Sequence, residues 1–152
     1  MRFFINPVWA TVALLSLAVS TTAYAQATTG ANTQKPMYLK TVMTQLNRDM
    51  QSVAGAISKE DWAEVAALAP KIASHQQPPM SEKMRILPWL GSNADKFRGF
   101  DEQVHRAATE MGEAAKRGDG QATINAFAKT QQSCLACHQN FRKPFVTHFY
   151  GK

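Results

Sequence analysis

Apolar residues recur every three or four positions along most of the chain beyond residue 35, which is the spacing of one helix face. The clearest run predicts a first helix over residues 36–57, and Pro36 suits its first turn because proline has no N–H to leave unpaired. The core-facing stripe of this helix consists of Leu39, Met43, Leu46, Met50, Val53 and Ile57. No segment alternates apolar and polar positions with β-branched enrichment, so we expect no strand.

A second helix is predicted to follow directly. It begins at Ser58, a candidate hydroxyl cap with Asp61 three residues later, and it ends in the proline-containing stretch 76–80. Pro70 is expected to kink it. A short helical piece over residues 81–87 is expected to stop before Pro88.

Two more helices complete the pattern. The third follows a capping signal at residues 92–95 and ends at the glycines of residues 118–120. The fourth begins near Gln121 and is expected to end at Pro144. Four amphipathic helices with mostly short connections predict an all-α fold, an antiparallel up-down-up-down four-helix bundle.

The first 25 residues have the order of a secretory signal peptide. Arg2 is followed by the mostly apolar segment 8–19 and by Ala23-Tyr24-Ala25, which predicts cleavage after Ala25. An uncleaved N-terminal anchor is the alternative. Residues 26–35 are predicted to form a flexible leader, and residues 36–152 the bundle domain, with a short C-terminal tail over residues 144–152. No later segment has the length of a membrane span, so none is expected in the mature protein.

Chemistry is concentrated in Cys134-Leu135-Ala136-Cys137-His138, the spacing by which haem is attached covalently. Each thiol can add to one haem vinyl group and form a thioether, and the adjacent imidazole of His138 can bind the iron. The motif therefore predicts one haem c, with the haem near the C-terminal end of the fourth helix.

Other uses of the two cysteines fit less well. A thioredoxin-like dithiol requires a βαβ context, and a zinc site requires four ligands in a suitable arrangement. A disulfide across this short spacing within a helix would be strained.

The chain resembles the class II c-type cytochromes, which include cytochrome c-prime and its low-spin, methionine-ligated relatives. The resemblance covers residues 36–143. It rests on the C-terminal haem motif followed by Phe141-Arg142-Lys143, on Tyr38 five residues before Met43, and on Leu87-Pro88-Trp89 before the third helix. Residues 76–80 and 144–152 depart from the family pattern.

The resemblance implies a candidate for the second axial ligand. In cytochrome c-prime the matching position on the first helix is apolar and the iron is five-coordinate, whereas the low-spin relatives have methionine there. Here that position is Met43. Antiparallel packing of the first and fourth helices independently brings the start of the first helix to His138, while Met50 lies about 10 Å deeper at roughly 1.5 Å per residue. The alternative is that Met43 only fills the core or lines the haem.

Two functions follow from these alternatives. Ligation by His138 and Met43 leaves no open iron site and predicts single-electron transfer. A five-coordinate haem would instead bind nitric oxide or carbon monoxide. An enzyme is not expected, because peroxidase-type chemistry requires an acid–base pair and the first helix offers no acid or histidine beside Met43.

The charged residues indicate what kind of partner the protein binds. The net charge is +6, and no acidic residue follows Asp119. We therefore expect periplasmic redox proteins with acidic docking surfaces as partners, and no nucleic acid. The family resemblance also allows a homodimer. Arg142, one helical turn after His138, is a candidate for a haem propionate or for solvent. His75 is a weaker candidate for iron, while His105 and His148 are interpreted as ordinary histidines, and Met84 and Met111 as core residues.

Overall fold

A computed structural model describes residues 36–151 of the chain, and every regular element in that range is helical. The expected signal peptide and leader, residues 1–35, lie outside the described residues. The elements in order are α1 (Tyr38–Ser58), α2 (Trp62–Ala73), α3 (Met80–Leu90), η1 (Gly91–Asn93), α4 (Ala94–Lys116), α5 (Gly120–Cys137), η2 (His138–Arg142) and α6 (Lys143–Tyr150).

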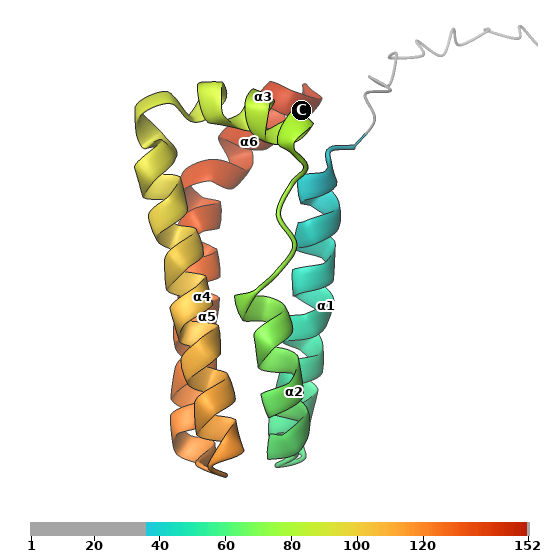
Figure 1. Cartoon of the computed structure of the whole chain (residues 1–152), viewed down its shortest axis with the longest axis vertical. Helices are drawn as coiled ribbons and strands as arrows, with labels where there is room; N and C mark the ends of the chain where they lie inside the picture. Colours follow the sequence, from blue (N-terminus) through green and yellow to red (C-terminus); the bar gives the residue numbers. More distant parts are fainter. Residues whose placement is uncertain (1–35, 152) are drawn as a thin grey trace, which may run out of the picture. The chain divides into compact units, whose positions relative to one another are not determined.

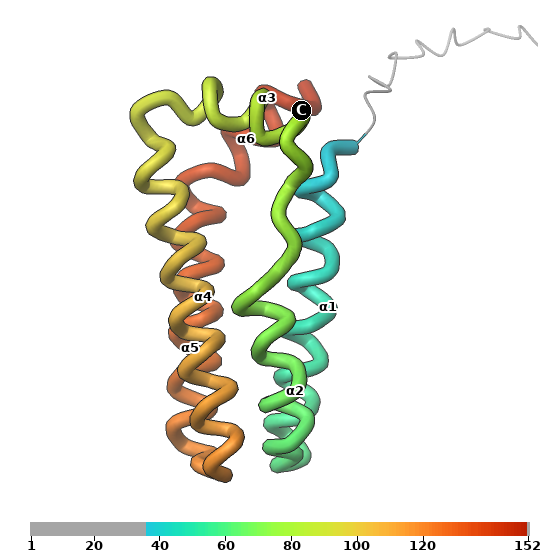
Figure 2. Tube along the Cα trace, viewed as in Figure 1, coloured from blue at the N-terminus to red at the C-terminus, as the bar shows by residue number. Residues whose placement is uncertain are grey.

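The four long helices α1, α2, α4 and α5 form the predicted antiparallel bundle. In Figure 1 and Figure 2 each of them runs opposite to the next in sequence, α1 packs beside α2, and α4 packs beside α2 and α5. The short helices α3 and α6 lie together across one end of the bundle (Figure 1). Within the described residues, no helix is both long enough and apolar enough to cross a membrane.

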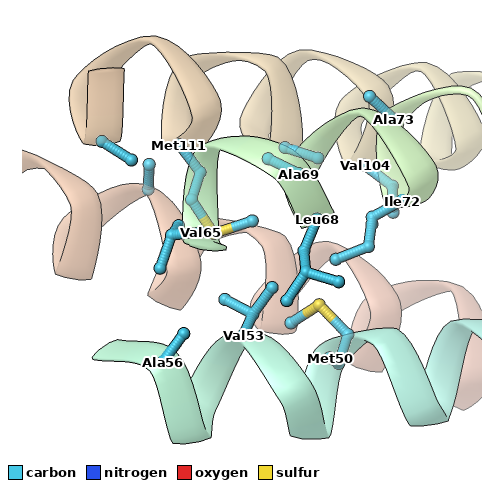
Figure 3. Packing of buried hydrophobic residues seen from close by; sticks show 13 residues of the cluster. Met50, Val53, Ala56, Val65, Leu68, Ala69, Ile72, Ala73, Val104 and Met111 are labelled. Carbon is cyan, nitrogen blue, oxygen red and sulfur yellow. The ribbon is translucent and has the colours of Figure 1, made fainter. Parts of the chain in front are cut away.

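The main core fills the half of the bundle away from α3. It is built where α1, α2 and α4 meet, from residues such as Met50, Val53, Ile72 and Met111 (Figure 3). Met111 is completely buried, as expected from the sequence. The predicted stripe of α1 is buried only in part, because Met43 near its start is exposed. The first half of that stripe therefore has another use than core packing.

Some helices begin or end at other residues than predicted, and local hydrogen bonds account for the start of α2. Asp61, not Ser58, caps α2, because its carboxylate accepts a hydrogen bond from the Glu64 N–H at 3.0 Å. Ser58 instead donates to the carbonyl of Ala54 within α1. The helix α3 continues through Pro88 to Leu90, so the expected stop before Pro88 is wrong.

The C-terminal segment, expected as a short tail, is helical from Lys143 to Tyr150. Pro144 lies in the first turn of α6, directly after the π-helical turn His138–Arg142, and the helical path continues through it. Phe149 is buried with Met37, Ile86, Leu90 and Phe141 in a second cluster, which we call the end cluster. Met84, expected in the core, is exposed on α3.

Candidate functional site

A cavity of about 300 Å³ occupies the half of the bundle that the main core leaves free. Its walls come from α1, from the α2–α3 connector (residues 74–79), and from α3, α4 and the end of α5. Most of the lining is apolar, as is usual for cofactor pockets. The apolar side chains include Leu39, Val42, Leu46, Ile86, Leu87, Leu90, Phe97, Phe100 and Val104.

All four residues predicted for the site line this one cavity: Cys134, Cys137, His138 and Met43. The first three come from the last turn of α5 and the start of η2, where their proximity follows from the helix itself. Met43 is about 90 positions earlier in the chain and comes from α1, which packs against α2 and not, as expected, directly against α5, so that the cavity lies between Met43 and the motif. The bundle therefore joins a local motif to a residue that is distant in sequence.

The two cysteines are free thiols, and both are partly buried. Burial raises the pKa of Cys134. Burial also raises the pKa of Cys137, to about 11, with smaller contributions from the negative charges of Asp101 and Cys134. At neutral pH both side chains are therefore uncharged, which suits the apolar surroundings.

His138 lies at the edge of the cavity, where the chain leaves α5 and enters the π-helical turn η2. Desolvation there, together with the positive charge of Arg142, lowers the pKa of the imidazole. The neutral ring, which has a free nitrogen lone pair and is the form that binds metals, is thus favoured at pH 7. π-Helical turns often occur at functional sites because they shift side chains relative to the helix face.

The three methionines around α1 have different environments. Met43 is 39% exposed and lines the cavity. Met50 is only 7% exposed and packs in the main core, and Met37 belongs to the end cluster. Of these thioethers, Met43 is the one that shares the cavity with His138.

The remaining histidines each interact with a protein group. His75 lines the cavity, but its Nδ1 lies 3.1 Å from the carbonyl oxygen of Ile72 and its Nε2 lies 3.2 Å from a carboxylate oxygen of Asp101. His105 hydrogen bonds to the Ala73 carbonyl at 2.8 Å, and His148 stacks on Trp89. Both ring nitrogens of His75 are therefore occupied, which does not favour a bis-histidine haem.

Some lining residues were missed or misplaced by sequence reasoning. Besides His75, the connector contributes Gln76, Gln77 and Pro78 to the wall, and the hydroxyl of Tyr38 donates to the side-chain carbonyl of Gln76. In the sequence this stretch signalled only the end of a helix.

The structure also places Arg142, for which a haem propionate and solvent were the alternatives, and Trp89. Arg142 is exposed and does not line the cavity, whereas Lys83 and Arg98 do. Trp89 packs against Phe145 and Phe149 in the end cluster.

The donor set fits a haem. Two thiols lie at the attachment spacing, an imidazole follows them directly, and a thioether faces the same apolar cavity. Comparison with known families agrees with this fit, because the family model "Cytochrome C'" matches residues 37–142. Comparisons with curated proteins and with solved structures give no significant match. Taken with the four-helix fold, the match shows that the chain belongs to the cytochrome c-prime family and is a c-type haem protein.

Proposed function

We propose that the protein is an exported, periplasmic carrier of single electrons. One haem c is attached through Cys134 and Cys137, and its iron is bound by His138 and Met43. The observation that carries the proposal is the position of Met43, which lines the same cavity as His138 while the neighbouring Met37 and Met50 pack elsewhere. A haem with both axial positions filled supplies reversible one-electron chemistry, and a thioether ligand raises its reduction potential.

The carrier role is also favoured over an enzymatic one by the acid–base groups of the cavity. Asp101 and His75 are paired with each other, and His75 also bonds to the backbone of α2. Neither is free for proton transfer to a bound substrate. Met43 would occupy the coordination position that a substrate needs.

Gas binding remains a second candidate because of how Met43 is held. This side chain belongs to neither the main core nor the end cluster. Its unbranched chain is flexible, so little packing opposes its departure from the iron. Nitric oxide or carbon monoxide would then bind to the ferrous haem on that side.

The test compares two methionine variants of the holoprotein. Replacing Met43 by leucine should convert a low-spin spectrum to a high-spin one and should allow carbon monoxide to bind. The Met50→Leu control removes a thioether from the main core and should keep the wild-type spectrum, at a stability cost below about 1.5 kcal/mol. A Met43→Leu protein with unchanged spectra would show that Met43 does not bind the iron.

The partners proposed are redox proteins with acidic docking surfaces. One face of α3 exposes Met80, Met84 and Leu87, and Leu87 and Lys83 also line the cavity. The carboxylate of Glu82 on this helix is occupied by the N–H groups of Tyr38 and Leu39. An apolar patch with the exposed Arg85 beside it is complementary to an apolar patch that is ringed by carboxylates.

A further inference from the structure

Lys83 is in an unusual place for a lysine. It belongs to α3, is partly buried, and lines the largely apolar cavity between the helices. Its backbone N–H donates to the Pro79 carbonyl, but its side-chain ammonium group has no hydrogen-bond or ion-pair partner among residues 36–151. An ammonium group beside apolar side chains loses part of its hydration, and a nearby anion normally offsets the free energy that this costs.

The other cationic side chains near the site either pair with a carboxylate or do not line the cavity. Arg98 also lines the cavity, but it is exposed and paired with two carboxylates. Its guanidinium Nη2 lies 2.9 Å from Asp95 Oδ1, and its Nε lies 3.8 Å from Glu102 Oε1. Arg142 is exposed and is not part of the cavity wall. Among the described residues, Lys83 is thus the cation of the wall that lacks an anion.

We propose that Lys83 binds a propionate of the haem. The two propionates are the charged substituents of the porphyrin, and they lie at the edge opposite to the vinyl groups. The thiols that would bind the vinyl groups are on α5, whereas Lys83 is on α3. Two different helices would therefore hold the two opposite edges of the haem. The carboxylate and the ammonium group form a charge-assisted hydrogen bond, and each neutralises the other in the cavity.

Two measurable effects follow from this contact. A neighbouring cation favours the ionised carboxylate, so the pKa of the propionate that Lys83 contacts is lowered relative to its twin. The same positive charge disfavours the ferric haem and raises the reduction potential. Both effects depend on the haem and not on Met43, so they are present whether the iron is five- or six-coordinate.

The experiment measures the reduction potential and the redox-difference infrared spectrum of the holoprotein as functions of pH. Wild type should show two separated propionate titrations. In Lys83→Gln the lower titration should move up toward the other, and the potential above both titrations should fall. Lys40→Gln is the matched control, because Lys40 is an exposed lysine on α1 that does not line the cavity. It should leave both curves unchanged.

A charge-conserving variant separates binding from mere packing, since Lys83→Arg should keep the two titrations apart. The proposal is overturned if Lys83→Gln and Lys40→Gln give the same curves. It is also overturned if the wild-type protein already shows one unresolved titration, a result that needs no variant to fold. The Met43 spectra test the proposed electron transfer separately, so either idea can fail while the other stands.

Discussion

At the scale of single residues, the cavity brings together groups whose charges are set by their surroundings. Burial keeps the thiols of Cys134 and Cys137 protonated, and desolvation with Arg142 keeps His138 neutral. His75 shows the opposite effect, because its hydrogen bond to Asp101 raises the pKa of the imidazole. The site thus offers uncharged groups beside the motif and one ion pair at the connector.

The His75–Asp101 pair predicts a dependence of stability on pH. The raised pKa of His75 contributes stability that is complete below about pH 6.5 and is lost as the pH rises through the folded-state pKa. The hydrogen bond from His75 lowers the pKa of Asp101, and that contribution is complete above about pH 4 and is lost in stronger acid. The pair is therefore most stabilising between about pH 4 and pH 6.5.

Urea unfolding of the holoprotein checks this window. Asp101→Asn should destabilise the protein more at about pH 5.5 than at about pH 8.5, because His75 is charged only at the lower pH. Equal losses of unfolding free energy at the two pH values would contradict the role of the pair.

Residue chemistry could be predicted from the sequence where it is local. Cys134, Cys137 and His138 are neighbours in the chain, so a helix suffices to bring them to one cavity. Met43 required the further assumption of an antiparallel bundle. His75 was a candidate from the sequence, but its pairing with Asp101 and the place of Lys83 in the wall could not be predicted, because they depend on how the connector and α3 cross the end of the bundle, and no periodic pattern encodes that path.

At the scale of elements, the helix that carries the haem motif does not stop at its predicted end. It widens into the π-turn η2 directly after Cys137 and continues as α6, whose aromatic residues fill the end cluster. Met37, just before α1, donates its backbone N–H to the Tyr150 hydroxyl at 3.0 Å. The segment beyond the family match thus ties the motif helix to the start of α1.

Removing one anchor of α6 should have a large effect. Phe149 is buried and packs against Trp89, Phe145 and His148, so Phe149→Ala should lower the unfolding free energy by about 3 kcal/mol. Lys143→Ala, an exposed position of the same helix, should change it by less than about 0.5 kcal/mol. Comparable losses in the two variants would show that α6 does not stabilise the bundle.

Helix number and direction could be predicted from apolar spacing, but several ends could not. Proline was treated as a stop at Pro88 and Pro144, yet its cost depends on the position within the helix. Pro88 lies near the C-terminus of α3, and Pro144 lies in the first turn of α6. Residues 144–152 contain too few apolar positions to show a helical periodicity. Their packing in the end cluster with Trp89 and Phe141 therefore could not be predicted from the sequence.

At the scale of the whole molecule, the bundle is divided between two tasks. The main core packs one half, while the other half holds the cavity, and α3 contributes to the cavity wall at the end of the bundle. The stripe of α1 serves both, because Met50 and Val53 fill the core and Leu39 and Met43 line the cavity. A bound haem would complete the interior of the second half.

The overall charge predicts how small oxidants react with the reduced protein. The full sequence has a net charge of +6, which is +5 without Arg2 of the predicted signal peptide, and the exposed Arg85 lies on α3 beside its apolar face. Oxidation by hexacyanoferrate(III), an anion, should slow as ionic strength rises from about 10 to about 150 mM, since the screening length falls from about 30 to about 8 Å.

Hexaammineruthenium(III) provides the matched cationic reagent for this experiment. Its reaction should become faster over the same range of ionic strength, because salt screens the repulsion between this cation and the basic protein. Stopped-flow rates with the same salt dependence for both reagents would contradict a basic surface next to the haem.

The most direct test of the central claim is the optical spectrum of the purified holoprotein, recorded oxidised, reduced, and reduced under carbon monoxide. Ligation by His138 and Met43 predicts sharp low-spin bands, a weak far-red sulfur-to-iron band in the oxidised form, and no change with carbon monoxide. Broad high-spin bands that shift with carbon monoxide would contradict electron transfer through a six-coordinate haem and would make this protein a gas-binding one.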